Sequence, residues 1–258
     1  MSNRNRSSYN IDKLALAIGN SRLHWAYFEQ DNLIETWDTP HLKEPIVGDR
    51  LPSHLFLDSS LRQVLETIPV YIASVVPQQT ELWQNYHDAR IVTLEDIELS
   101  NLYPTLGIDR ALAIWGGGET YGYPCLIIDG GTALTFTAAD PQRQLIGGAI
   151  LPGLRSQFLA LNQKTAALPE VALPANLPPR WALDTNNAIA SGIVYSVLAG
   201  IYSYIENWQK RYPNSQIILT GGDGEILSQY LARQYPSLKT ICDRNLIFYG
   251  INLIARQA

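Results

Sequence analysis

The chain is poor in cysteine, with only Cys125 and Cys242 among its 258 residues. No Cys-x-x-Cys spacing occurs, so neither a paired metal-binding motif nor a redox pair is indicated. Cys125 lies in the apolar run Pro124–Ile128, and Cys242 directly follows Ile241. Because free cysteine is among the most buried residue types, we expect both side chains to be buried as small hydrophobes.

Positive charge and long apolar runs are also scarce. The chain has 19 Lys and Arg against 24 Asp and Glu, a net charge of −5, and no Lys/Arg run, which argues against a nucleic-acid surface. No run approaches the roughly 18 apolar residues of a membrane span, and the N-terminus lacks the apolar core of a signal peptide. We therefore expect a cytoplasmic protein with no membrane and no nucleic-acid partner.

Several common catalytic motifs are missing. There is no Gly-x4-Gly-Lys-Ser/Thr loop, which excludes a P-loop kinase as far as sequence can. Neither Gly-x-Ser-x-Gly nor His-Glu-x-x-His occurs, and the four histidines have no metal-binding spacing.

The strand pattern instead indicates a duplicated fold. Residues 13–38 predict three short antiparallel strands, and residues 124–151 repeat the same order. Each set is followed by helices and a further strand, which predicts an α/β fold of two lobes, each a mixed sheet with flanking helices. We expect a disordered tail at 1–10, an N-terminal lobe at 11–118 and a C-terminal lobe at 119–258, the helix from Ala111 to Trp115 being closed by three glycines. Ligands of such sheets bind near the strand ends, here in a cleft between the lobes.

Two glycine turns between adjacent strands are candidates for phosphate binding. The longer motif runs from Ile127 to Thr135 and contains Asp129-Gly130-Gly131-Thr132, and a similar turn lies at Ala17–Ser21. Glycine lets the backbone approach a ligand closely, exposed amides can hold phosphate oxygens, and a carboxylate can hold a cation. A turn aspartate that bonds its own backbone would explain the Asp-Gly pair alone. It would not explain the threonine or the recurrence.

The motif Gly107-Ile108-Asp109-Arg110 is a candidate for catalysis. A carboxylate within reach of a hydroxyl can accept its proton during phosphoryl transfer, and an arginine can bind a carboxylate or phosphate through two hydrogen bonds. The structural alternative is that Asp109 is the N-cap of the helix over residues 110–115. Both interpretations can hold together.

Two further sites have structural alternatives of the same kind. Gly221-Gly222-Asp223-Gly224 follows a predicted strand and is either a plain strand-to-helix turn or a loop that admits adenosine. Thr185 is either the N-cap of the long helix predicted from Thr185 to Arg211 or a hydroxyl offered to a substrate.

Together the motifs resemble those of type III pantothenate kinases, in the acetate kinase/sugar kinase/Hsp70/actin superfamily. The resemblance covers most of residues 13–256. Its elements are Ile18–Ser21, Gly107–Arg110, Asp129–Ala133, Gly147–Gly153, and Thr185 with Ala188–Gly192.

The resemblance implies two ribonuclease H-like lobes and ATP-dependent phosphorylation of pantothenate to 4'-phosphopantothenate, the first step of coenzyme A synthesis. It implies Asp109 as general base and Asp129 as ligand of a monovalent cation, K⁺ or NH₄⁺, with Mg²⁺ also required. Substrate contacts would come from Tyr103, Gly107, Ile108, Asp109, Arg110 and, from the partner subunit of a homodimer, Thr185. ATP contacts would come from Ala17, Ile18, Gly19, Asn20, Ser21, Arg22, Leu23, His24, Thr132, Gly221 and Gly222.

The chain departs from the family pattern at Ala17, where the family has an aspartate that helps position Mg²⁺. Three alternatives stay open: Mg²⁺ is held by water and phosphate oxygens, another carboxylate substitutes, or activity is weak or lost. The alternatives to the kinase are a non-catalytic nucleotide-binding regulator and another small-molecule kinase of the superfamily, because fold alone does not fix the substrate.

Overall fold

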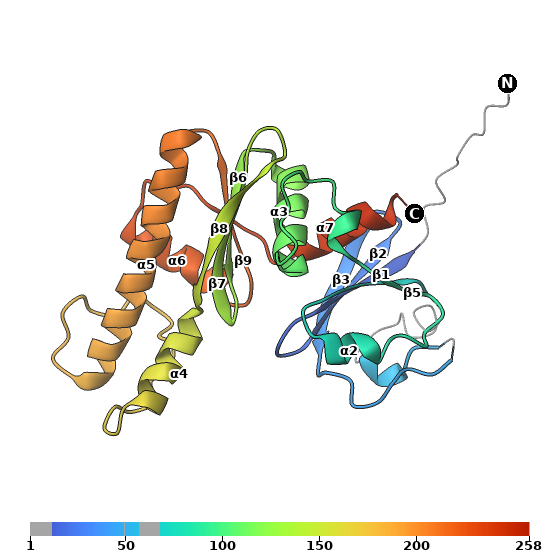
Figure 1. The fold of residues 1–258 in the computed structure, drawn as a ribbon. Coiled ribbons are helices and arrows are strands. Elements are labelled where there is room, and N and C mark those ends of the chain that lie inside the picture. The colour runs from blue at the N-terminus through green and yellow to red at the C-terminus, as the bar shows by residue number, and fades with distance from the viewer. Residues whose placement is uncertain (1–11, 49, 57–67, 258) are drawn as a thin grey trace. The chain divides into compact units, whose positions relative to one another are not determined.

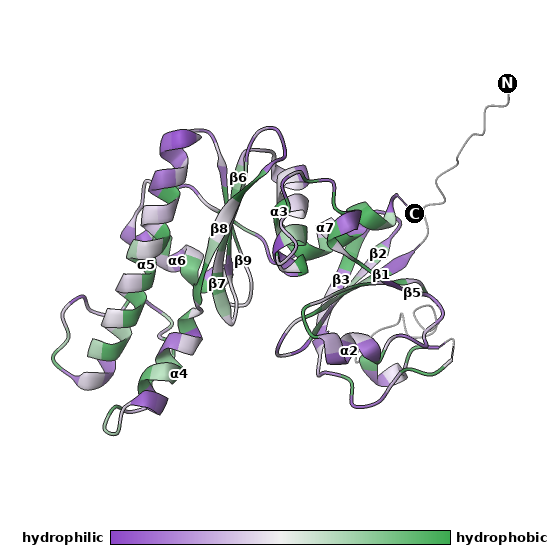
Figure 2. Ribbon diagram, in the orientation of Figure 1, coloured by the Kyte–Doolittle hydropathy of each residue, from purple (hydrophilic) through white to green (hydrophobic). Residues whose placement is uncertain are grey.

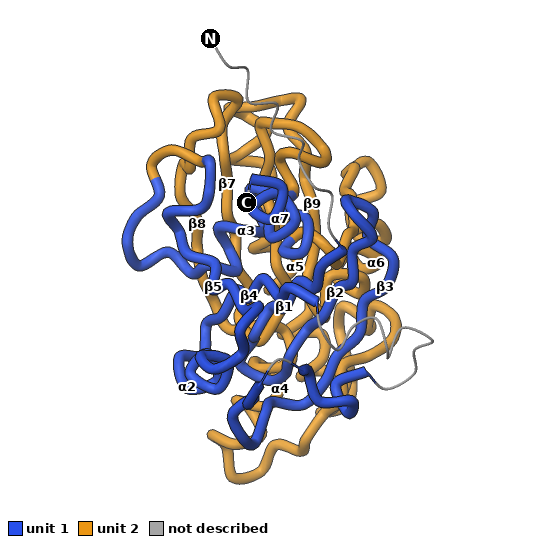
Figure 3. The backbone as a smooth tube through the Cα atoms, turned by 90° about the vertical axis from the view of Figure 1, so that its right-hand side faces the viewer, with its two compact units in different colours: residues 1–98, 102–116, 247–258 blue, residues 99–101, 117–246 orange. Residues whose placement is uncertain are grey.

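A computed structural model describes residues 12–48, 50–56 and 68–257. The tail expected at 1–10 therefore lies outside the described residues. The chain divides into two compact units, one of residues 1–98, 102–116 and 247–258 and the other of residues 99–101 and 117–246 (Figure 3). The last segment thus groups with the first unit, whereas the sequence pattern assigned it to a lobe spanning 119–258.

The first unit contains a five-stranded sheet. Its strands are β1 (Lys13–Ile18), β2 (Leu23–Glu29), β3 (Asn32–Thr39), β4 (Val70–Ser74) and β5 (Ala89–Ile91), in the spatial order β3-β2-β1-β4-β5. Short turns join β1, β2 and β3, which are therefore antiparallel, while β4 runs parallel to β1 and β5 parallel to β4. The three strands predicted over 13–38 are confirmed.

Aromatic side chains fill one face of this sheet. Trp25 and Trp83 are fully buried, and the Trp25 and Trp37 rings stack with centroids 5.9 Å apart. The indole N–H of Trp25 donates to Oγ1 of Thr39 at 2.9 Å, so this large side chain is buried with its polar atom satisfied. The short helical segments nearby are η1 (Ser53–Leu55), α2 (Pro77–Glu81) and η2 (Leu94–Asp96).

Helix α3 (Ile108–Tyr121) runs straight through the glycines that were expected to end it. A Cβ at Gly117 would lie 2.8 Å from Cδ1 of Ile127, and one at Gly118 would overlap the ring of Tyr123. The prediction of a helix closed at Trp115 was therefore wrong, because these glycines permit close packing inside a helix rather than break it.

The second unit repeats the first sheet. Its strands are β6 (Cys125–Gly130), β7 (Ala133–Ala139), β8 (Leu145–Pro152), β9 (Gln216–Thr220) and β10 (Ile241–Cys242), in the order β10-β9-β6-β7-β8 (Figure 1). The antiparallel and parallel pairings match those of the first sheet strand for strand. Two mixed sheets with flanking helices confirm the predicted α/β fold class, and the internal duplication is real.

Helices α4 (Leu154–Lys164), α5 (Thr185–Arg211) and α6 (Gly224–Gln234) accompany this sheet. Val194 and Ile201 of α5 are fully buried in one cluster with Ile128 and Leu219 of the strands. By length and composition α5 could also cross a membrane, but half of its most apolar window is buried in this core. Figure 2 shows its C-terminal end as hydrophilic.

Helix α7 (Leu246–Ala255) is the last helix of the described chain and is mostly apolar (Figure 2). Most of it packs in the first unit, where a Cβ at Gly250 would lie 2.5 Å from the carbonyl oxygen of Leu112 in α3. At its end the Nε of Arg256 lies 2.8 Å from Oδ1 of Asp31, in the turn between β2 and β3. These contacts explain why the last segment belongs with residues far away in the sequence.

The two cysteines have different environments. Cys125 is fully buried, and burial raises the pKa of its thiol to about 12. Cys242 is exposed, so the expectation that both are buried was wrong for this residue. It lies in the two-residue strand β10, which is the edge strand of its sheet among the residues that the structure describes.

Candidate active site

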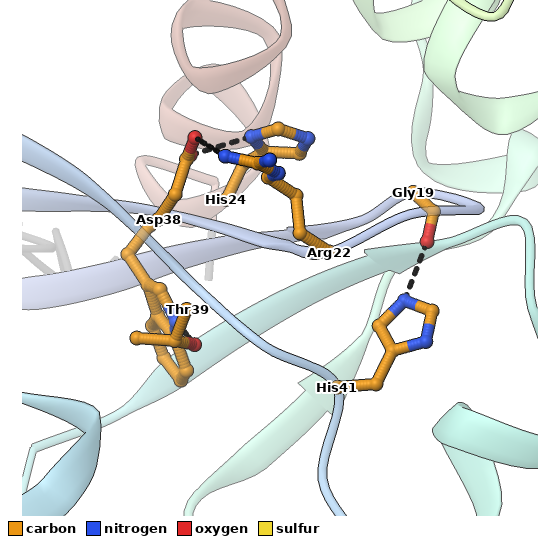
Figure 4. A network of polar contacts seen from close by, with 7 residues as sticks. Gly19, Arg22, His24, Asp38, Thr39 and His41 are labelled. Carbon is orange, nitrogen blue, oxygen red and sulfur yellow. Dashed lines mark hydrogen bonds and ion pairs between the residues drawn. The ribbon is translucent and has the colours of Figure 1, made fainter.

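The first predicted phosphate hairpin joins β1 to β2 in the first unit. Ile18 and Leu23 form its last strand pair, and the backbone N–H of Gly19 donates to the carbonyl of Arg22 at 3.1 Å. The ring of His41, which follows β3, donates from Nε2 to the carbonyl oxygen of Gly19 at 2.8 Å (Figure 4). The turn is therefore anchored at its glycine, while residues 20–22 are exposed.

The second hairpin, between β6 and β7, is anchored in a similar way. Its tip residue Thr132 is exposed, and the Thr132 carbonyl accepts hydrogen bonds from the backbone N–H of Gly153 at 2.9 Å and the hydroxyl of Ser156 at 2.8 Å. Both donors follow β8, the third strand of this sheet, just as His41 follows the third strand of the first. Each hairpin tip is thus hydrogen-bonded by the segment that follows the third strand of the same sheet.

The duplication places Ala17 and Asp129 at equivalent positions. Ala17 is in the second-to-last strand pair of its hairpin, opposite His24, and Asp129 is in the second-to-last strand pair of its hairpin, opposite Thr135. Their strands, β1 and β6, are the middle strands of their sheets. At the position equivalent to the Asp129 carboxylate, the described strand β1 therefore carries the methyl group of Ala17.

The glycine loop after β9 packs directly against Asp129. Gly221 has a φ of +82°, and a Cβ there would overlap Oδ1 of Asp129 and lie 2.9 Å from the backbone of Gly130. The N–H of Asp223 donates to the carbonyl of Gly130 at 2.8 Å. The structure thus brings together the predicted cation ligand and the loop predicted to admit adenosine, and only glycine fits at the contact.

The Gly-x-Asp-Arg motif forms the start of α3. The helix begins at Ile108, so Asp109 lies in its first turn, and the interpretation of Asp109 as the N-cap of a helix over 110–115 was wrong. Oδ1 of Asp109 accepts the backbone N–H of Arg110 at 2.8 Å. A Cβ at Gly107 would lie only 2.5 Å from the same oxygen, so the carboxylate occupies space that any other residue at 107 would need.

Arg110 is buried, and its guanidinium reaches back to the segment before the helix. Its NH1 donates to the hydroxyl of Tyr103 at 3.1 Å, and Tyr103 is 39% exposed. Four of the predicted substrate residues (Tyr103, Gly107, Asp109 and Arg110) therefore form one continuous group. Ile108 lies between Gly107 and Asp109 in the sequence.

Thr185 is the first residue of α5, but it is not the N-cap. That role belongs to Asp184, whose Oδ1 accepts the backbone N–H of Asn187 at 2.9 Å. This bond lowers the pKa of the Asp184 carboxyl. Within the part of the chain that the structure describes, no hydrogen bond or ion pair joins Thr185 to the second hairpin or the glycine loop.

Two acidic side chains next to the predicted sites, Asp223 and Asp38, have polar contacts that the sequence did not predict. Asp223 is buried and accepts from Nε of Arg155 at 2.8 Å, and Asp38 on β3 accepts from both Arg22 and His24 beside the first hairpin. Arg155 lies two residues after the Pro-Gly that ends the Gly147–Gly153 motif, and this proximity was the available signal. Nothing in the sequence near Asp38 marks it, because only strand pairing brings it to the hairpin.

Comparison with known proteins decides the family. The sequence model of the type III pantothenate kinases matches residues 13–207. A type III pantothenate kinase from Nostoc sp. (strain PCC 7120) is 48% identical over 257 residues, which cover 93% of each chain. This chain belongs to the type III pantothenate kinase family. The family catalyses ATP-dependent phosphorylation of pantothenate in coenzyme A biosynthesis, so the activity predicted from the motifs is confirmed at the level of the family.

Solved structures confirm the fold of this type III pantothenate kinase. A Baf family protein from Campylobacter jejuni has a TM-score of 0.61 at 22% identity, covering 95% of this chain and 98% of its own. The activator of 2-hydroxyisocaproyl-CoA dehydratase from Clostridium difficile, solved with bound ADPNP, has a TM-score of 0.53 at 12% identity, covering 96% and 95%. The roles of the individual site residues, the cleft between the lobes and the cytoplasmic location stay predictions.

Proposed function

We propose that the chain transfers the γ-phosphoryl group of ATP to the hydroxyl of pantothenate, with Asp109 as general base. The Asp109 carboxylate takes the hydroxyl proton as the new oxygen–phosphorus bond forms and the bond to the β-phosphate oxygen breaks, releasing ADP. The observation that carries this is the start of α3, where Gly107 leaves room for the carboxylate and the N–H of Arg110 orients it.

Pantothenate would be held by the residues around that carboxylate. The substrate is itself a carboxylate, and the guanidinium of Arg110, oriented by Tyr103 at 3.1 Å, suits an anionic group. Gly107 and Ile108 would contribute backbone contacts. Thr185 would complete the site from the partner subunit, which is consistent with a hydroxyl that has no described partner in its own chain.

ATP would be bound by the two anchored hairpins and the glycine loop. Residues 17–24 and Thr132 would contact the phosphates, and Gly221 and Gly222 would admit the adenosine. Support comes from the hydrogen bonds to the carbonyl oxygens of Gly19 and Thr132, which fix the two hairpin tips. Residues 20–22 and Thr132 are exposed, so they are accessible to a ligand.

Asp129 would hold the monovalent cation that offsets the phosphate charge. Its carboxylate lies against the backbone of Gly131 and Gly221, and potassium is bound by carboxylate and carbonyl oxygens. For Mg²⁺ the first hairpin offers no carboxylate at position 17. Among residues 12–48, 50–56 and 68–257 no group of three His, Cys, Asp or Glu side chains is placed to hold a metal. Mg²⁺ would therefore be held largely by phosphate oxygens and water.

A homodimer is the proposed assembly, and the second unit carries a fitting surface. A groove of about 560 Å³ lies between α4 and α5 and is lined almost entirely by apolar atoms, including Leu161, Ile189 and Ile193. Just before α5, Trp181 is 91% exposed and Leu183 is fully exposed. Exposed apolar surface of this kind marks association sites, and it adjoins Thr185, which would serve the partner's substrate.

A coupled assay of ADP release tests the proposal. We expect release that depends on pantothenate, that is not supported by a panel of other small alcohols, and that falls when K⁺ is replaced by Na⁺. ATP binding without release would favour the non-catalytic regulator, and release with a different acceptor would favour another kinase of the superfamily. Indifference to the monovalent cation would remove the role of Asp129.

A further inference from the structure

The first hairpin carries Arg22 and His24, whereas the second carries the carboxylate of Asp129. In the second sheet the row of paired residues across β6, β7 and β8 is Asp129, Thr135 and Ile150. In the first sheet the equivalent row across β1, β2 and β3 is Ala17, His24 and Asp38. Directly paired residues share a face of the sheet, so the acidic group has moved two strands away from the hairpin strand.

Asp38 is the common acceptor of the Arg22 guanidinium and the His24 ring. Its Oδ1 lies 2.7 Å from Nδ1 of His24, and its Oδ2 accepts NH1 of Arg22 at 3.1 Å. Figure 4 shows both side chains directed at the same carboxylate, on the opposite face of the sheet from Thr39. All three side chains are about half exposed, so a ligand can reach them.

The bond to Asp38 fixes which ring nitrogen of His24 is available. An ionised carboxylate only accepts hydrogen bonds, so Nδ1 of His24 carries the hydrogen that is donated to it. The other nitrogen, Nε2, lies 3.5 Å from the position of a Cβ on Gly19. Among the residues that the structure describes, Nε2 has no hydrogen-bond partner. It therefore lies free beside the tip of the hairpin that is proposed to bind phosphate.

We propose that Asp38 is a positioning residue for nucleotide binding, which holds His24 and Arg22 at the first hairpin as direct contacts for the phosphates. This rests on the proposed function in so far as that hairpin binds ATP. In its imidazolium form His24 donates from Nε2 to a phosphate oxygen, and Asp38 balances the charge. The first hairpin thus contacts phosphate through side-chain cations, whereas the second carries a carboxylate for a bound cation.

The test compares the binding of ADP and adenosine by calorimetry in three single variants. Asp38→Asn removes the charge and one of the two acceptor oxygens, Asp38→Glu keeps the carboxylate, and Glu35→Gln is the matched control. Glu35 is an exposed carboxylate on the same strand, with no ion pair among the described residues. For Asp38→Asn we expect the Kd of ADP to rise about tenfold, the loss typical of a hydrogen bond to a charged group. Adenosine binding should be unchanged, Asp38→Glu should restore part of the ADP affinity, and Glu35→Gln should match the wild type.

A triple variant, compared with its double-variant parent, tests whether Asp38 acts through His24 and Arg22. In a chain that already carries His24→Gln and Arg22→Gln, adding Asp38→Asn should leave the Kd of ADP unchanged. Equal losses of ADP and adenosine binding in Asp38→Asn would show a purely structural role and overturn the inference, as would unchanged ADP binding. The two proposals can fail separately. If Asp38→Asn weakens ADP binding as expected but the wild-type protein releases no ADP when given ATP and pantothenate, the proposed function is wrong and the role of Asp38 in nucleotide binding still holds.

Discussion

A Cβ at Gly107 would lie 2.5 Å from Oδ1 of Asp109, so the carboxylate occupies the place of a side chain two residues earlier. The atom in the way is the end of a short side chain rather than backbone. A larger residue at 107 can therefore be accommodated by turning the carboxylate away. The glycine of this motif is required by the position of the carboxylate rather than by the fold.

Gly107→Ala should lower kcat at least tenfold with little change in stability. The added methyl group displaces the proposed base from its bond with Arg110, and a misplaced catalytic group loses rate steeply. Steady-state kinetics and a thermal melt measure the two effects. Gly200→Ala is the matched control, since nothing lies within 4 Å of a Cβ there. A fully active Gly107→Ala enzyme would mean that the orientation of Asp109 is unimportant.

Gly250→Ala should lower the stability of the protein with little change in kcat. Its Cβ would meet the backbone of Leu112, with 2.5 Å to the carbonyl oxygen, so α7 must move away from α3. Overpacking of this kind costs about 1–3 kcal/mol, which lowers Tm by several degrees. Differential scanning fluorimetry checks this against Gly200→Ala, and an unchanged Tm would show that the two helices are not in close contact.

Much of the fold could be predicted from the sequence because its signals are local. Apolar alternation and tight turns defined the two three-strand meanders, and their recurrence revealed the duplication. The end of α3 could not be predicted locally. Glycine normally weakens helices, and only the neighbouring Ile127 and Tyr123 show why Gly117 and Gly118 lie inside this helix.

The residues of the candidate site also fall into those that the sequence could predict and those that it could not. The glycine motifs were visible because each is contiguous in sequence, and the structure brings Asp129 against Gly221 as a loop site requires. Asp38 and His41 were not visible, because they reach the first hairpin through strand pairing across β3. The pairing of β3 with β2 is a contact between segments distant in sequence, and it is defined only in the folded sheet.

The thiols should report their different burial. One equivalent of Ellman's reagent should react rapidly with the native protein at pH 8, at exposed Cys242. Cys125 should react only after unfolding, because burial removes access and raises its thiol pKa to about 12. The variant Cys242→Ser should show no rapid reaction. Two rapid equivalents in the native wild type would contradict the buried position of Cys125.

The proposed dimer should depend on the exposed residues before α5. The double variant Trp181→Ser, Leu183→Ser removes two large apolar side chains from the surface and should shift the protein toward monomer in analytical ultracentrifugation. If Thr185 serves the partner's site, the KM for pantothenate should rise as the dimer dissociates. Tyr71→Ser, at a partly buried aromatic of the first sheet, would test fold integrity rather than assembly. An unchanged dimer in the double variant would place the interface elsewhere.

The most direct measurement is phosphoryl transfer to pantothenate by Asp109→Asn, with ATP binding measured on the same sample. Asparagine keeps the size and the bond to the N–H of Arg110 but cannot take the proton. The account predicts that ATP affinity stays within about twofold while kcat falls about 10²–10⁴-fold, the range of a lost general base. Turnover close to the wild-type rate would contradict the assignment of Asp109 as the base.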